Sequence, residues 1–222
     1  MKAKFKILVV LFFSATVSAQ EIDTLNFYSD SFNEMRQVFI HKPIFYKYKS
    51  DSVQLPVIYL LDGQHEWFVN PLLSDINYLQ YTHEIPNAIV VVIPFKDRNK
   101  ECSIPNLKSN TALDRFITEE LDTKLEQYNP SGFKMIIGHS FSSSFSLYSY
   151  LNHPNYYSAV IAHSPMDNFE KMVDLFEQNS NINKSNISIS IGGIAAGKDY
   201  YHRKNYDQVK NKFPSFFKLI TT

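Results

Sequence analysis

MIIGHSFSSSFSLY, residues 135–148, joins a short apolar run to an apolar helical pattern through Gly138, His139 and Ser140. A strand that turns sharply at a serine and continues as a helix is the nucleophile elbow, in which the serine hydroxyl is exposed at the apex. The usual pattern is G-x-S-x-G, and here the small residue Ser142 replaces the last glycine. The alternative is that Ser140 is an ordinary helix N-cap. The strand–turn–helix context favours a nucleophile.

The segments on either side of this motif predict an α/β fold. Runs that are apolar on both faces are typical of buried parallel strands, and they cover residues 55–63, 87–95, 133–140, 157–165 and 187–194. Residues 24–43 predict an antiparallel hairpin, and helical patterns cover 110–128, 141–152 and 168–178. Residues 213–222 are interpreted as the start of a last strand. Alternating strands and helices predict a mostly parallel sheet with helices on both faces and a site at its carboxyl edge.

The N-terminus predicts that the protein is exported. Residues 1–19 combine early lysines, an apolar run from Ile7 to Phe13 and small residues ending at Ala19, the pattern of a cleaved signal peptide. The mature domain would then be 20–222, secreted or periplasmic.

The charge balance also bears on possible partners. Lys plus Arg and Asp plus Glu both number 22, which argues against a nucleic-acid partner. No later stretch could span a membrane. Cys102 is the only cysteine, so a cysteine-based zinc site is excluded.

Four segments in order carry a family resemblance: VIYLLDGQ at 57–64, FKDRNKECSIPN at 95–106, IIGHSFSSSFSLY at 136–148 and AHSP at 162–165. With these motifs the chain resembles the esterase D-like family of α/β-hydrolases, which includes enterochelin esterases, S-formylglutathione hydrolase, feruloyl esterases and antigen 85. The resemblance extends over roughly residues 30–213. It implies an α/β-hydrolase fold and a serine esterase that needs no cofactor or metal.

The resemblance also implies roles at matching positions. Ser140 would be the acyl-accepting nucleophile, and the backbone N–H groups of Phe141 and Gln64 would form the oxyanion hole. Arg98 is interpreted as either structural or substrate-facing. The triad order in this fold is serine, acid, histidine. Asp199 is therefore the candidate acid; Asp207 is an alternative, expected within the following helix.

The triad histidine is not visible in the expected place. His65, His139, His163 and His202 are each expected to be structural or on the surface, with His202 and His163 the first substitutes to consider. The simplest interpretation is a C-terminally incomplete domain that lacks the last strand and helix. Its function would be hydrolysis of a small-molecule or polysaccharide-linked ester through Ser140, with little activity in this form. The alternative is a non-catalytic binding protein with a hydrolase fold.

Overall fold

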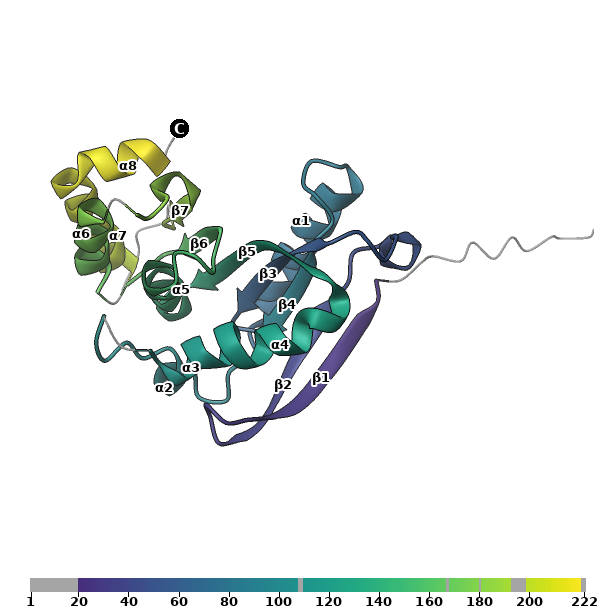
Figure 1. The fold of residues 1–222 in the computed structure, drawn as a ribbon. Coiled ribbons are helices and arrows are strands. Elements are labelled where there is room, and N and C mark those ends of the chain that lie inside the picture. Colours follow the sequence, from purple (N-terminus) through teal and green to yellow (C-terminus); the bar gives the residue numbers. More distant parts are fainter. Residues whose placement is uncertain (1–19, 108–109, 167, 180, 193–198, 221–222) are drawn as a thin grey trace, which may run out of the picture.

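A computed structural model describes residues 20–220, apart from 108–109, 167, 180 and 193–198 (Figure 1). The side chains of 199–202 and 218–220 also lie outside the description. The predicted signal peptide, residues 1–19, is therefore outside the described residues. Among the residues described, no helix has both the length and the apolar character needed to cross a bilayer.

A seven-stranded mixed sheet forms the centre of the molecule, in the order β1-β2-β4-β3-β5-β6-β7. β1 pairs antiparallel with β2, and β2 pairs antiparallel with β4; the remaining pairs are parallel. The strands are β1 (Ile22–Ser29), β2 (Glu34–His41), β3 (Leu55–Leu61), β4 (Ile89–Ile93), β5 (Pro130–His139), β6 (Ala159–His163) and β7 (Ile187–Ser190). The predicted hairpin and all five predicted parallel strands are confirmed.

Helices cover both faces of this sheet, as predicted. They are α1 (Glu66–Tyr81), α2 (Arg98–Glu101), α3 (Ala112–Arg115), α4 (Asp122–Leu125), α5 (Phe141–Asn152), α6 (Phe169–Gln178), α7 (Asp199–Lys212) and α8 (Pro214–Ile220). Short helical turns are η1 (Tyr46–Tyr48), η2 (Phe116–Leu121), η3 (Glu126–Tyr128) and η4 (Lys184–Asn186). The helix predicted over 110–128 is the continuous series α3, η2, α4 and η3, in which η2 is π-helical and Thr111 forms a capping box with Asp114.

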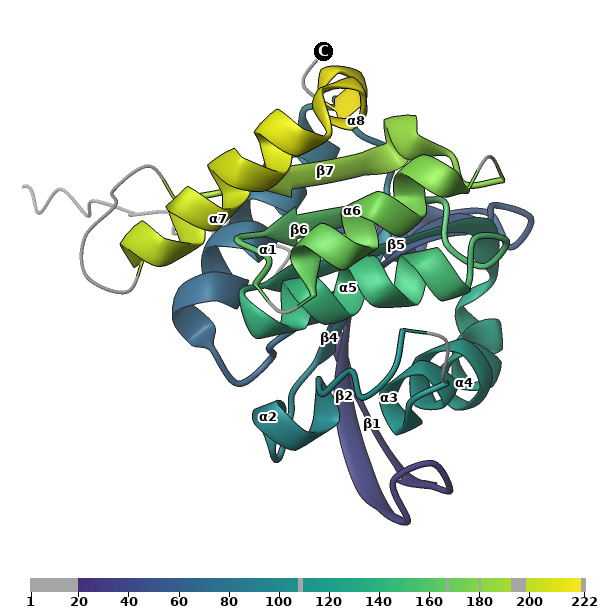
Figure 2. The same cartoon turned by 90° about the vertical axis from the view of Figure 1, so that its left-hand side faces the viewer.

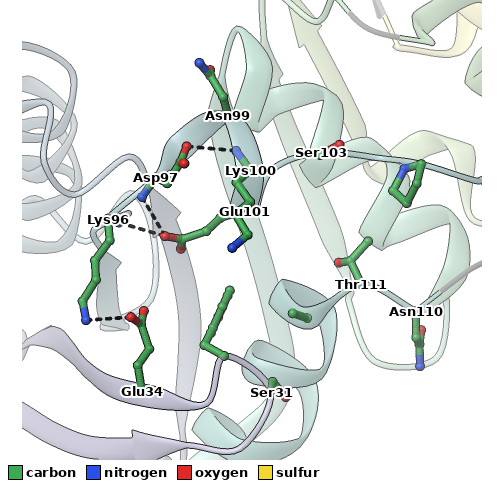
Figure 3. Close-up of a pocket in the computed structure, with 13 residues that line it drawn as sticks. Ser31, Glu34, Lys96, Asp97, Asn99, Lys100, Glu101, Ser103, Asn110 and Thr111 are labelled. Atoms are coloured by element: carbon green, nitrogen blue, oxygen red, sulfur yellow. Dashed lines mark hydrogen bonds and ion pairs between the residues drawn. The ribbon is translucent and has the colours of Figure 1, made fainter.

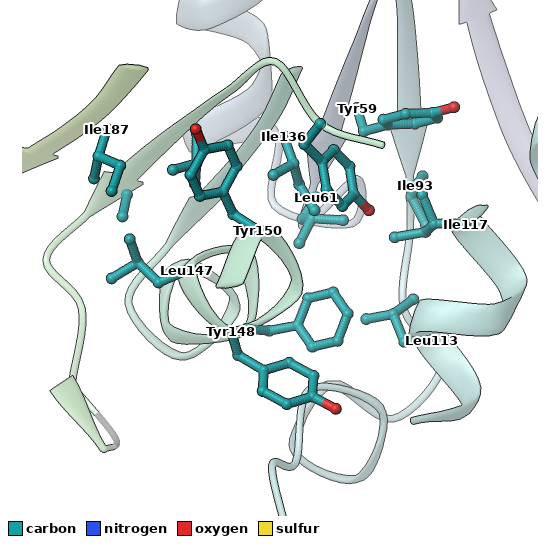
Figure 4. Close-up of a cluster of buried hydrophobic side chains, with 14 of the residues drawn as sticks. Tyr59, Leu61, Ile93, Leu113, Ile117, Ile136, Leu147, Tyr148, Tyr150 and Ile187 are labelled. Carbon is teal, nitrogen blue, oxygen red and sulfur yellow. The ribbon is translucent and has the colours of Figure 1, made fainter. Parts of the chain in front are cut away.

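Alternate residues of β3 divide the core into two layers. Ile58 and Leu60 face α1, whose Phe68, Leu73 and Ile76 complete one cluster. The residues between them face the second and larger cluster, which includes residues of the helices from α3 to α8. Figure 4 shows the part of this cluster around Tyr59 and Leu61. Such alternation follows from the two-residue period of a strand. Because both faces of the strand are buried, β3 needs the continuous apolar sequence that predicted it.

The last segment differs from its prediction. Residues 214–220 form α8, and they do not begin a strand. Pro214 suits the first position of a helix because its missing N–H would have no partner there. Phe216 stacks on Phe176 of α6 with ring centroids 5.9 Å apart, and Phe217 packs against Phe169 and Tyr206. Figure 2 shows α6, α7 and α8 gathered around β7.

Candidate active site

Ser140 lies at the apex between β5 and α5, where the predicted elbow is present. Its backbone has φ 55° and ψ −115°, a conformation that costs a non-glycine residue energy and is concentrated at functional sites. Gly138 is required by packing, because a Cβ there would come 2.5 Å from the carbonyl oxygen of Ser142. Ser142 is fully buried. These contacts explain why the turn uses small residues, and they are not those of an ordinary N-cap, since the Ser140 side chain caps no helical N–H.

The Ser140 hydroxyl contacts a methionine. Its Oγ donates to Sδ of Met166 at 2.9 Å, while the Ser140 N–H donates to the His163 carbonyl at 2.7 Å. Met166 is held in turn, because its N–H donates to the Ser144 hydroxyl at 2.8 Å. A thioether is only a weak acceptor and takes no proton at neutral pH. Met166 therefore covers the hydroxyl and cannot activate it.

The proposed oxyanion donors are the backbone N–H groups of Gln64 and Phe141. Within the described part of the chain, neither the Gln64 N–H nor the Phe141 N–H donates a hydrogen bond. The turn that presents Gln64 is tight: Asp62 has φ 64°, and a Cβ on Gly63 would meet the Pro94 nitrogen at 2.7 Å. Free backbone donors next to a nucleophile suit a developing negative charge because they are oriented in advance.

The Asp62–Arg98 ion pair connects the turn that carries Gln64 with the turn at Ser140. The sequence interpretation did not predict this connection. The Asp62 carboxylate is fully buried, and it accepts from the Ser142 hydroxyl and from Nε and Nη2 of Arg98. Arg98 Nη2 also donates to the His139 carbonyl at 2.7 Å. Burial lowers the pKa of Arg98, but hydrogen bonding and the charge of Asp62 outweigh this and raise it. Of the two roles considered for Arg98, the contacts favour the structural one.

Three histidines lie around the exposed Trp67 and the buried Phe68 near this edge. Trp67 is 5.8 Å from the His65 ring and 5.1 Å from the His139 ring, and Phe68 is 6.0 Å from the His163 ring. The His163 Nδ1 is paired with the Ser190 hydroxyl. Burial lowers the pKa of both His139 and His163. None of the histidines with described side chains bonds to the Ser140 hydroxyl.

Of the two candidate triad acids, Asp199 and Asp207, only Asp207 has a described side chain. Asp199 begins α7, but its side chain and that of His202 lie outside the described residues. Asp207 lies within α7, as predicted, where it pairs with Arg203 at 3.2 Å and its side chain is half exposed. An ordinary helical ion pair of this kind does not indicate a triad acid.

A cavity of about 770 Å³ lies between the β1–β2 turn and α2, and Ser140 is not among the residues that line it (Figure 3). Lys96 forms an ion pair with Glu34 in its lining, and the Asp97 carboxylate accepts the backbone N–H of Lys100. No cluster of residues suited to holding a metal ion occurs among the described residues. The predicted site at the carboxyl edge of the sheet is therefore the better candidate.

A family model described as "Putative esterase" matches residues 29–199 of this chain. The Uncharacterized protein YjcH of Bacillus subtilis (strain 168) is 25% identical over 172 residues, which cover 75% of this chain and 70% of that protein. The family match agrees with the predicted resemblance over nearly the same residues. It supports an enzyme that hydrolyses esters.

Solved structures share the fold. An IroE-like serine hydrolase from Shewanella oneidensis superimposes with a TM-score of 0.71 at 21% identity, covering 88% of this chain and 70% of that one. Enterochelin esterase from Shigella flexneri gives 0.65 at 18% identity, with coverage of 89% and 52%, so this chain spans about half of it. A ferulic acid esterase gives 0.65 at 16% identity, with coverage of 87% and 86%. The predicted α/β-hydrolase fold is confirmed.

Proposed function

Because this chain belongs to the family described as "Putative esterase", we propose that it hydrolyses carboxylic esters through an acyl-enzyme on Ser140. The observation that carries the proposal is the strained backbone of Ser140 at the junction of β5 and α5. The Ser140 oxygen would attack the ester carbonyl carbon. The resulting oxyanion would accept from the N–H groups of Gln64 and Phe141, and the alcohol would leave with a proton. Water would then release the acid and regenerate the serine.

The proton of Ser140 must pass to a base before the oxygen can attack efficiently. Asp199 is the proposed orienting acid because it follows β7, in the chain order of this fold. Of the histidines considered as substitutes, His163 has a described ring; it ends β6, and its carbonyl accepts the Ser140 N–H. Conversion of His163 to alanine tests it directly: the base function predicts a loss of several orders of magnitude in kcat.

A second function is supported by the Met166 contact. A serine hydroxyl that donates to a thioether has no proton acceptor in that arrangement. We propose, as the alternative, a binding protein that keeps the fold and has lost catalysis. The two functions differ in one measurement, namely whether Ser140 can be acylated or phosphonylated at all.

The proposed place of action is outside the cytoplasm, after removal of residues 1–19. The substrate would be a small or polysaccharide-linked ester. Expression of the full chain in a Gram-negative host, followed by fractionation and N-terminal sequencing, tests export. A mature chain that begins at Gln20 supports it, whereas an intact Met1 in the cytoplasm contradicts it.

The nucleophile is tested with a fluorophosphonate probe and with p-nitrophenyl acetate. We expect labelling of the full chain, its loss in Ser140→Ala, and its retention in Ser188→Ala, which changes an exposed serine on β7. Slow ester turnover alongside labelling supports the esterase with a weak base. A chain that is neither labelled nor active supports the binding protein.

A further inference from the structure

The fully buried Asp62 lies at the junction of three segments that the proposed reaction depends on. It begins the turn after β3, it accepts from Ser142 in the first turn of α5, and it pairs with Arg98 at the start of α2. Arg98 extends the junction to the elbow itself through the His139 carbonyl, one residue before the nucleophile. The pair therefore connects the loop of one oxyanion donor with the loop of the other.

The side chain of Gln64 is part of the same junction. Its Nε2 donates to the Asp62 carboxylate at 3.2 Å, and its Oε1 accepts the Phe95 N–H at 2.8 Å. One end of the amide is thus held within its own turn and the other by the loop after β4, while the backbone N–H of the same residue donates to no group among the described residues. This arrangement fixes the direction of the N–H without giving the side chain a part in the chemistry.

Ser142 fixes the other donor. Its hydroxyl accepts the His139 N–H at 2.9 Å and donates to Asp62, so the turn on either side of Ser140 is braced against the same carboxylate. Phe141, which provides the second donor, lies between Ser140 and Ser142 in the chain. One buried carboxylate is therefore bonded both to Gln64 and to the residue that follows Phe141.

We propose that the Asp62–Arg98 ion pair is a positioning device that holds the Gln64 and Phe141 N–H groups in one oxyanion hole around Ser140. The inference rests on the proposed function, which requires those two donors. Asp62 is fully buried, and Arg98 is bonded to Asp62 and to the His139 carbonyl, so both would act through the backbone that they brace. Errors of about 1 Å in a catalytic group reduce rates by roughly 100-fold, so loosening either loop should lower turnover more than binding.

The test uses Arg98→Met, Arg98→Lys and the matched control Arg115→Met in the full chain. Arg115 is a partly exposed residue of α3 that donates to the Asn110 carbonyl and, within the described part of the chain, makes no hydrogen bond or ion pair with Asp62, Gln64 or the elbow, so its loss should leave the site intact. We expect Arg98→Met to lower kcat for p-nitrophenyl acetate by about 10- to 100-fold with KM changed less than about twofold. The kcat of Arg98→Lys should be intermediate, because lysine lacks the planar guanidinium that reaches both the Asp62 carboxylate and the His139 carbonyl. Circular dichroism and Tm confirm that each variant is folded.

A second measurement does not require turnover. Amide hydrogen exchange of peptides covering 62–66 and 138–142 should rise together in Arg98→Met, and it should stay unchanged in β1 and β2. If the parent chain is active and Arg98→Met has the same kcat, the positioning role is overturned while the esterase stands. If the parent chain neither turns over nor reacts with the probe, the proposed function fails. Exchange then decides the inference alone: a joint rise supports it, and a rise in only one loop or in neither overturns it.

Discussion

The two ends of α2 hold two buried ion pairs of the same chemistry in different surroundings. At its first residue, Arg98 pairs with Asp62 under the candidate active site. At its last residue, Glu101 pairs with Arg36 of β2 at 2.6 Å, beside the cavity of Figure 3. The side chains of Arg36 and Glu101 are 2% and 6% exposed, whereas Arg98 is 22% exposed over a fully buried Asp62.

The partners of the two pairs are what separate their roles. Glu101 also accepts the N–H groups of Lys96 and Asp97, and Arg36 also donates to the Pro94 carbonyl, so this pair joins a hairpin to the loop after β4. Asp62 instead joins segments that carry proposed reacting groups. The same type of ion pair therefore supports the fold at one end of α2 and the proposed oxyanion hole at the other.

The largest effect is expected at the structural end. Arg36→Met leaves the Glu101 carboxylate buried without its cation, and breaking a buried pair in this way costs roughly 3–5 kcal/mol. In the parent chain the Arg36 guanidinium carbon lies 4.3 Å from the centroid of the Phe32 ring. A methionine side chain can still pack on that ring, so part of the apolar contact survives. Urea unfolding measures the loss. A decrease below about 1 kcal/mol would show that the pair contributes little to the fold.

The second-largest effect is expected from two isosteric variants, Asp62→Asn and Glu101→Gln. Asp62→Asn tolerates the left-handed φ of 64°, but its NH₂ faces Arg98 whichever carboxylate oxygen it replaces, because both oxygens accept from Arg98. We expect kcat to fall about 10- to 100-fold with a modest loss of stability. Glu101→Gln should show the reverse, with a clear loss of stability and an unchanged kcat in the folded protein. Equal effects of the two variants on kcat would remove the distinction between the ends of α2.

The elbow could be predicted from sequence because a local pattern specifies it: an apolar strand, Gly138, Ser140 and small residues within one turn. The Asp62–Arg98 pair could not, because its members are 36 residues apart and each has an ordinary local interpretation. One feature of the sequence could have indicated a role for Asp62: it is a charged residue between a fully buried strand and the glycine of a tight turn. Met166 had none, since its contact with Ser140 depends on the turn after β6.

Helices were missed where polar residues interrupt the pattern. In α1 the buried residues Val69, Leu73 and Ile76 recur at helical spacing, but Pro71 and several polar residues obscured it. Residues 213–222 looked like a strand because two adjacent phenylalanines are apolar. In the structure both are buried within α8, since Phe216 meets α6 while Phe217 meets α6 and α7. Burial on two sides of a helix imitates the apolar run of a strand.

Cys102 follows α2 and can report on both ends of it. Its thiol is fully buried, and burial raises its pKa, so reaction with a thiol reagent requires local opening. We expect Arg36→Met to increase the labelling rate by Ellman's reagent several-fold more than Arg98→Met, because Cys102 directly follows Glu101. Equal rates in the two variants would mean that α2 opens as one unit.

The smallest effect concerns pH. Between about pH 5 and 8 unperturbed carboxylates and arginines keep their charges, and the histidines near the site whose pKa is shifted are His139 and His163. Asp62, Arg98, His65 and His163 lie near the His139 ring, and burial, the largest influence, lowers its pKa. The His163 ring lies against Phe68 and Ser190, and burial lowers its pKa too.

A histidine whose pKa is lowered on folding binds its proton more readily in the unfolded chain. Its contribution to stability is therefore complete above the ordinary value of 6.5 and is lost as the pH falls below that value toward the folded pKa. We expect Tm to fall between pH 7.5 and 5.5 and the slope to be shallower in His163→Gln. The matched control is Ser190→Ala, which removes the hydroxyl partner but keeps the imidazole and should therefore keep the slope. A slope that is unchanged in His163→Gln would show that its imidazole is as readily protonated in the folded protein as in the unfolded chain, and that burial at the end of β6 does not control its charge.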